Sequence, residues 1–213
     1  DLGRLVAFTS AGEWAINGND SGILLPTAIN ARQYTYNGSG RVPPIIINGN
    51  ALYLQARGSR VRDLGYELAS DGYRGNDLSI FSSHLLDNYS ILDWTYQQIP
   101  QSLVWAVRND GKLLCLTYLK EQEMLAWTHH DFGNDVVKSV TSVPEGNEDI
   151  LYVCVERTIN GAVYKYIERL SERNPANVED YKILDCHATF DGRNTISTTM
   201  VINGGTTWEY DED

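Results

Sequence analysis

The chain has 213 residues, of which 42% are apolar and 21% charged, a balance typical of a globular protein with a buried core. Its formal net charge of −11 argues against a protein that wraps nucleic acid, because phosphate binding depends on clustered lysine and arginine. No apolar run approaches the roughly 20 residues that a membrane-spanning helix needs, so we expect no membrane partner.

Four stretches of the chain open in the same way and at nearly the same spacing. They begin at Leu5, Leu52, Leu103 and Leu151, and the intervals between them are 47, 51 and 48 residues. A repeated unit of this size that is built of strands is typical of a β-propeller blade. We therefore predict an all-β, β-propeller-like fold with about four blades of antiparallel strands, in a closed ring or an open one.

The repeat also suggests how the chain is divided. Residues 1–170 hold the four units and form the predicted propeller-like domain, whereas residues 171–213 contribute further strands and an acidic tail. The chain opens at Asp1 within a predicted strand, without a methionine or a signal-peptide pattern. We therefore expect it to be a fragment of a longer protein.

The first units consist of short strands separated by turns. Asn48, Gly49 and Asn50 form a strong turn signal, because asparagine and glycine accept the backbone angles of tight turns. Ala11 and Gly12 mark another turn. The predicted strands cover residues 5–8, 14–16, 33–36, 45–47 and 52–55.

Residues 77–87 interrupt the strand pattern. Asn76 and Asp77 are suited to cap a helix, because their side chains accept hydrogen bonds from its first backbone amides. Apolar residues then recur at helical spacing. We predict a short helix inserted between blades, with an inward face made of Leu78, Phe81, Leu85 and Leu86.

The blade pattern is clearest over residues 103–144. Predicted strands cover residues 103–108, 113–119, 123–130 and 136–144, with turns at residues 109–111 and 130–134. We predict that these four strands form one blade. The next unit begins with a hairpin whose turn lies at Asn160 and Gly161. Strands of both units alternate with period two, so one face of each is expected to pack against a neighbouring blade.

The signals weaken after residue 170. Residues 170–180 are rich in charge and contain Pro175, which favours a surface loop. Residues 181–188 and 198–202 are predicted to be strands. The acidic tail from Glu209 to Asp213 is expected to be frayed.

Patterns for metal binding are weak. His129 and His130 are adjacent on a predicted strand, so they point to opposite faces and cannot readily share a metal. His84 and His187 have no partner at a metal-binding spacing. Residues 17–22 resemble the start of a calcium loop, but Ala28 stands where its last acidic ligand belongs, so we interpret them as a turn.

Patterns for catalysis are also weak. Ser39 lies between two glycines without the spacing of a nucleophile elbow, and Ser83 precedes His84 without a fixed acid beside it. Carboxylates are plentiful, and a pair could meet across a propeller face as in glycosidases, but the sequence selects no pair. We predict no catalytic, cofactor-binding or metal-binding residue, and no cofactor.

The cysteines and aromatic residues favour packing roles. Cys115 and Cys154 lie within strand patterns, and with Cys186 they are expected to be buried thiols of a reducing compartment rather than disulfide partners. Core packing between blades is the preferred role of the aromatic residues, and sugar stacking is the alternative. The aromatic residues concerned are Trp94, Tyr96, Trp105, Tyr118 and Trp127.

Residues 4–170 resemble a tail protein of double-stranded DNA bacteriophages and prophages, similar to the nozzle or hub proteins of short-tailed phages. The likeness is firmer in the second half, in the run from Asp77 to Phe132 and in the run from Val136 to Leu170. The motif residues, to which the resemblance assigns structural roles, are Trp105, Arg108, Asp110, Gly111, Tyr118, Trp127, Arg157, Gly161 and Glu168.

The resemblance implies a structural virion protein that is not an enzyme. It implies that the chain joins a ring-shaped homo-oligomer, contacts other phage tail or adaptor proteins, and lets DNA pass without specific binding. It also implies assembly in the bacterial cytoplasm and a final location in the virion tail. Two alternatives remain, namely a carbohydrate-binding or glycan-cleaving propeller and a bacterial interaction scaffold.

Overall fold

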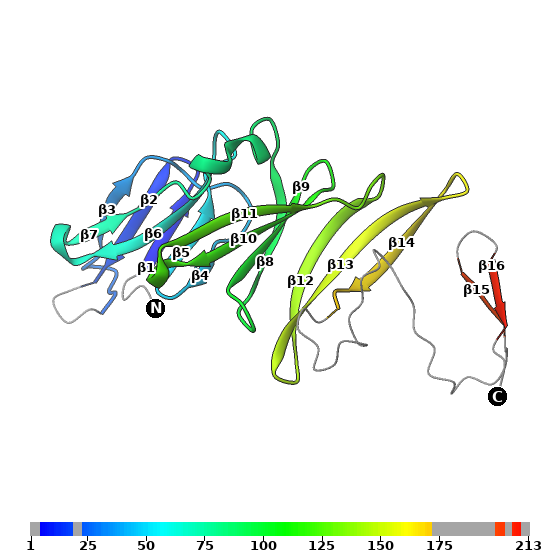
Figure 1. The fold of residues 1–213 in the computed structure, drawn as a ribbon. Coiled ribbons are helices and arrows are strands. Elements are labelled where there is room, and N and C mark those ends of the chain that lie inside the picture. The colour runs from blue at the N-terminus through cyan, green and yellow to red at the C-terminus, as the bar shows by residue number, and fades with distance from the viewer. Residues whose placement is uncertain (1–4, 19–22, 172–198, 203–205, 210–213) are drawn as a thin grey trace.

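Four antiparallel sheets follow one another along the chain in the computed structural model, which describes residues 5–18, 23–171, 199–202 and 206–209 (Figure 1). The predicted all-β, antiparallel character is confirmed. Sheet 1 contains β1 (Leu5–Thr9), β2 (Gly12–Asn17) and β3 (Asn30–Thr35). Sheet 2 contains β4 (Ile45–Ile47), β5 (Asn50–Leu54), β6 (Val61–Glu67) and β7 (Gly72–Arg74).

The second pair of sheets is built from longer strands. Sheet 3 contains β8 (Ile91–Gln97), β9 (Leu103–Arg108), β10 (Leu113–Leu119) and β11 (Met124–His130). Sheet 4 contains β12 (Val136–Glu145), β13 (Glu148–Ile159) and β14 (Ala162–Arg169). A separate hairpin pairs β15 (Thr199–Ile202) with β16 (Thr206–Glu209). The strand predicted at residues 198–202 is thereby confirmed, whereas residues 181–188 and 210–213 and most of the predicted loop lie outside the described residues.

The sheets pack face to face, with an apolar core at each of the three junctions. Strand β9 shows how one strand serves two junctions, because its side chains alternate between the faces of the sheet. Leu103, Trp105 and Val107 lie in the core shared with sheet 4, whereas Val104 and Ala106 lie in the core shared with sheet 2. A strand buried on both faces is expected to be mainly apolar, and this explains the continuous apolar run of residues 103–107 in β9, which only the paired Arg108 follows.

Strand β5 has the same double role between sheets 1 and 3. Ala51 and Tyr53 lie in the core with sheet 1, and Leu52 and Leu54 lie in the core with sheet 3. Sheets 2 and 3 are therefore each covered on both faces. Sheets 1 and 4 are the two ends of the row, and no closed ring is detected in the described part of the chain.

The sheet that contains β9 to β11 begins and ends one strand earlier in the chain than the predicted blade. Strands β9 to β11 pair with β8 in sheet 3, whereas β12, which was predicted as their fourth partner, begins sheet 4. Strand β8 was not predicted. Because β12 does not pair with β11, the residues 131–135 form a crossing between sheets rather than a hairpin turn.

The four stretches that open alike are not equivalent in orientation. Leu52 and Leu103 both face the next sheet along the chain, but Leu151 faces the preceding sheet and Leu5 is exposed on the outer side of sheet 1. A one-residue change of phase moves a strand residue to the opposite face. The spacing therefore identifies recurring strands but does not fix which face each one buries.

The predicted short helix near residues 77–87 is confirmed, although it has 3₁₀ geometry and its predicted inward face is partly wrong. The segment forms a 3₁₀ helix, η2 (Ile80–Leu85), that is interrupted by non-helical backbone angles at Ser82. Leu78 and Leu86 are buried in the core between sheets 2 and 3, with Leu85 packed against them, but Phe81 is 91% exposed. Because the α-helical spacing is not maintained, Phe81 turns away from its predicted partners. The other 3₁₀ turns are η1 (Leu68–Ser70) and η3 (Lys120–Gln122).

Candidate functional site

The motif residue Trp105 is fully buried at the junction of sheets 3 and 4. Its indole Nε1 donates a hydrogen bond of 2.8 Å to the side-chain oxygen of Gln97, whose Nε2 in turn donates to the backbone oxygen of Asp149. The carboxylate of Asp149 accepts hydrogen bonds from the backbone amides of Gln98 and Ile99, at 2.8 and 3.1 Å. The loop after β8 is thereby held to the start of β13 by a continuous polar chain.

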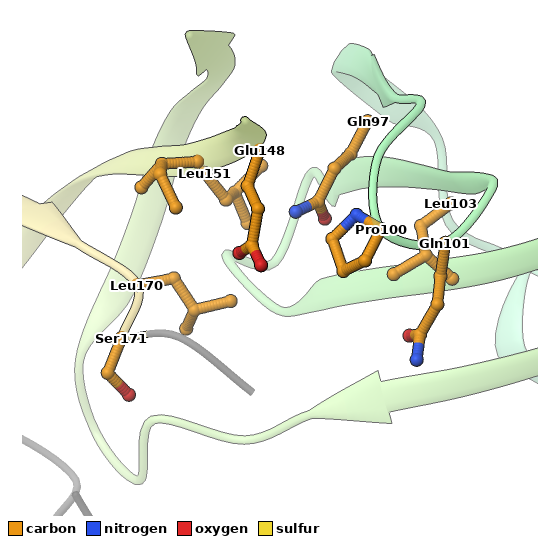
Figure 2. Close-up of a pocket in the computed structure, with 9 residues that line it drawn as sticks. Gln97, Pro100, Gln101, Leu103, Glu148, Leu151, Leu170 and Ser171 are labelled. Atoms are coloured by element: carbon orange, nitrogen blue, oxygen red, sulfur yellow. The ribbon is translucent and has the colours of Figure 1, made fainter. Parts of the chain in front are cut away.

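A small pocket lies beside this connection, as Figure 2 shows. Gln97, Pro100 and Gln101 line it from the β8–β9 side, and Glu148 and Leu170 line it from sheet 4. It has room for about one water molecule, which is far less than a sugar or a drug-sized ligand requires. We therefore assign it to the packing of the junction rather than to ligand binding.

Arg108 and Asp110 join sheet 3 to the segment that precedes it. The guanidinium donates to both carboxylate oxygens of Asp110, with the Nε contact at 2.7 Å, and its Nη1 donates to the backbone oxygen of Leu85 at 2.7 Å. It also lies over the ring of Tyr89, 3.7 Å from the ring centre. The hydrogen bonds from Arg108 hold the pKa of Asp110 below its usual range, and Asp110 raises the pKa of Arg108.

Gly111 and Gly161 are both motif residues with positive φ, at +86° and +79°. Their surroundings differ. A Cβ atom on Gly111 would lie 2.4 Å from Cγ1 of Val136, whereas one on Gly161 would meet open space. The backbone oxygen of Gly111 also accepts a hydrogen bond of 2.9 Å from the amide of Val137, at the start of sheet 4.

These two glycines give a matched prediction. We expect Gly161→Ala to lower the free energy of unfolding by about 1 kcal/mol, because only the left-handed backbone conformation is strained. Gly111→Ala adds a steric clash and should cost about 2 kcal/mol or more. Urea denaturation of both variants measures the difference. If the two variants lose the same free energy of unfolding, Gly111 is not required for Val136 of sheet 4 to pack closely against this turn.

Tyr118 and Trp127 connect sheet 3 to sheet 2. The buried hydroxyl of Tyr118 donates to Asp63 of β6 at 3.3 Å, and Lys120 approaches the same carboxylate at 3.4 Å. Burial and the negative charge of Asp63 raise the pKa of Tyr118 far above its usual range. The indole of Trp127 donates to the backbone oxygen of Leu78 at 2.8 Å. Both motif residues therefore fix sheet 3 against elements that precede it.

Arg157 and Glu168 form the third connection, within sheet 4. The Nε and Nη2 atoms of Arg157 on β13 donate to Glu168 on β14, at 2.6 and 2.8 Å, and Nη1 donates to Asp135 at 2.5 Å. Asp135 lies just before β12. Arg157 on β13 thus contacts both β14 and the connection that leads from sheet 3 into β12.

The motif residues do not converge on one site. Seven of the nine donate or accept side-chain interactions that connect separate strands, loops or sheets, and the two glycines shape turns. Trp94, Trp105 and Tyr118 are buried, as the packing interpretation predicted, so their rings are covered and cannot stack on a sugar. Trp127 and Tyr96 are partly buried against the core between sheets 2 and 3.

The remaining predicted features are dispersed. His84 lies in η2, whereas His129 and His130 lie on β11. Among the residues that the structure describes, no three His, Cys, Asp or Glu side chains are grouped as a metal site requires. Cys115 is buried and Cys154 half buried, and neither forms a disulfide, while Cys186, His187 and residues 19–22 lie outside the described ranges. No helix in the described ranges is long and apolar enough to cross a membrane.

Sequence reasoning missed a buried polar group between sheets 1 and 2. Glu13 on β2 is only 1% exposed, and both of its carboxylate oxygens lack a hydrogen-bond partner within the described residues. The buried hydroxyl oxygens of Thr35 and Tyr53 also lack one. Burial raises the pKa of Glu13, and the backbone amide of Glu13, the positive charge of Arg62 and the backbone amide of Asn37 only partly offset the effect. One feature of the sequence could have indicated this. Glu13 lies two residues before Ala15, so the two side chains share a face of the strand, and that face is buried.

The sequence was also compared with models of known protein families and with curated proteins, and neither comparison finds a match.

Proposed function

We propose that this chain is a structural component of a bacteriophage tail, of the nozzle or hub type, and that sheets 1 to 4 are successive blades of a β-propeller-like domain. It acts mechanically and not as an enzyme. Its partners are further copies of itself in a ring and other tail or adaptor proteins. The protein is assembled into the particle in the bacterial cytoplasm, and its final location is the tail of the virion.

The observation that carries the proposal is the row of sheets, each packed on the next with its strands in chain order. The first strands of neighbouring sheets also meet. The amides of Val140 and Ser142 on β12 donate to Asp93 and Thr95 on β8, at 3.1 and 3.2 Å. In a propeller the first strand of each blade lies nearest the axis, so contacts between first strands favour a radial arrangement.

A similar contact leads from β8 back towards β4. The indole of Trp94 on β8 donates a hydrogen bond of 2.7 Å to the backbone oxygen of Pro43, two residues before β4. The motif residues that carry the resemblance add to this support, because they connect the sheets and the loops between them rather than surrounding a cavity. Side chains that connect sheets in this way suit a protein with a structural role.

The charge of the chain suits the same role. A formal net charge of −11 repels phosphate, and a conduit needs that repulsion if DNA is to pass without binding. The proposal therefore predicts no specific DNA affinity.

The proposal is tested in phage particles produced by the bacterium that carries the gene. We expect the chain to be recovered with purified particles, and immunogold labelling with antibodies against residues 23–171 to mark the tail below the capsid. Interrupting the gene should leave DNA-filled heads that cannot infect, and the intact gene supplied in trans should restore plaques. Particles that lack the chain and infect normally would contradict the proposal.

A further inference from the structure

Glu13 occupies an unusual position at the junction of sheets 1 and 2. Its partners in the strand register are Phe8 on β1 and Thr35 on β3. The ring of Phe8 lies 5.1 Å from the ring of Tyr53 on β5, which places this part of β2 directly against sheet 2. The carboxyl group is therefore enclosed between two sheets rather than at the rim of one.

The enclosed group has only partial compensation for a negative charge, because the backbone amides of Glu13 and Asn37 and the charge of Arg62 do not fully offset the effect of burial. A buried carboxylate is stable only when hydrogen-bond donors or a cation replace the water that it has lost. Neither oxygen of Glu13 has a hydrogen-bond partner in the described residues. A neutral carboxylic acid costs much less to bury, and it carries a proton that it can donate.

The titratable and charged groups that face Glu13 from the neighbouring elements are Tyr53 on β5 and Arg62 on β6. Arg62 is paired with Tyr53 in the strand register, but its Nε donates to Gln55 at 2.7 Å. Its charge acts on Glu13 through space without a hydrogen bond. Burial raises the pKa of Tyr53, and the negative charge of an ionised Glu13 raises it further. Thr35 and Asn37 contribute polar but uncharged groups.

We propose that Glu13 is a proton-dependent latch between sheets 1 and 2: the neutral acid allows the two sheets to close on each other, and its ionisation loosens their junction. This inference does not depend on the phage-tail role, because it concerns the association of two sheets within one chain. It adds a conformational response to pH at the junction of sheets 1 and 2.

The direction of the pH dependence follows from the two states of Glu13. Its pKa is raised in the folded chain relative to the unfolded chain, so the folded state binds the proton more tightly. The stabilisation is fully present below the unfolded pKa and is lost as the pH rises through the folded pKa. Relative to a chain in which residue 13 cannot ionise, the unfolding constant therefore grows by up to tenfold per pH unit between these two values and then levels off.

The test compares the unmodified chain with Glu13→Gln, which keeps the shape but not the ionisation. We expect the two to be similar at acidic pH, and Glu13→Gln to be the more stable at mildly alkaline pH. Amides of β2 should then exchange with solvent more slowly in Glu13→Gln than in the unmodified chain. The exposed Glu123→Gln is the matched control and should follow the unmodified chain throughout.

A second measurement keeps the inference testable if Glu13→Gln fails to fold. The side-chain carboxyl carbon of Glu13 can be followed by NMR during a pH titration of the unmodified chain. A midpoint above the ordinary glutamate value is expected. A midpoint at or below that value, or a Glu13→Gln chain that is less stable than the unmodified one at alkaline pH, would overturn the latch and show that Glu13 is an ion stabilised by Arg62.

Discussion

Replacing Trp105 with alanine is expected to lower the free energy of unfolding by about 3–5 kcal/mol, the range for removing a large aromatic side chain from a core. Trp105 is fully buried at the junction of sheets 3 and 4, and it belongs to the strand that packs on both neighbouring sheets. The substitution leaves a cavity and removes the donor to Gln97. Urea denaturation followed by circular dichroism measures the loss.

A matched variant separates the two contributions. Trp105→Phe keeps most of the apolar volume but leaves the side-chain oxygen of Gln97 without its indole donor, so about 1–3 kcal/mol of the loss should remain. Gln97 also connects to Asp149 at the start of sheet 4, and we expect the amides of β13 to lose protection from hydrogen exchange in both variants. A loss below 1 kcal/mol for Trp105→Ala, on the order of an exposed site, would show that the junction does not depend on this side chain.

The sequence predicted the local elements better than their grouping. Strands such as β9 and β10 and the turn at Gly111 are encoded by neighbouring residues, through apolar runs and through the backbone freedom of glycine. The boundary between sheets 3 and 4 is not local. Residues 131–135 carry the same turn signal as a hairpin. Distant contacts show that the chain has passed to a new sheet, because β12 pairs with β13 and contacts Asp93 and Thr95 of β8.

The roles of the motif residues were predictable only in general terms. Trp105 and Tyr118 could be placed in cores because they lie on apolar strands. Their hydrogen-bond partners could not be named, since Tyr118 and Asp63 are 55 residues apart and Trp127 and Leu78 are 49 apart. Pairs at such separations are set by the packing of whole sheets.

The exposure of Phe81 and the burial of Glu13 were not predicted, for related reasons. Spacing alone suggested that Phe81 would share a buried face with Leu78, but the 3₁₀ geometry of η2 breaks that alignment. Glu13 was overlooked because a single charged residue on a short strand is ordinarily solvated. In the structure sheet 2 covers it, and that contact depends on residues such as Tyr53, far along the chain.

Arg108→Ala is expected to cost about 2–3 kcal/mol at neutral pH, the range for removing a buried charged donor whose partner, Asp110, is partly exposed to water. The side chain of Arg108 is 8% exposed, and its loss leaves the backbone oxygen of Leu85 without its side-chain donor and Asp110 with only the weak hydrogen bond from the backbone amide of Lys112 at 3.4 Å. The segment containing η2 would lose its attachment to sheet 3. Arg108→Lys, which keeps the charge but not the two-pronged contact with Asp110, should recover only part of the stability.

The pH dependence distinguishes a charge effect from lost packing. Arg108 lowers the pKa of Asp110, so the stability that this pair contributes is present above the ordinary aspartate value and is lost as the pH falls through the folded value. The cost of Arg108→Ala should therefore shrink in acid. The contact with the ring of Tyr89 does not depend on the charge of Asp110, so a cost that stays constant from neutral to acidic pH would assign the effect to that contact instead. The measurement is the denaturant midpoint of the unmodified chain, Arg108→Ala and Asp110→Asn from neutral to acidic pH. It distinguishes the charge effect from the packing effect.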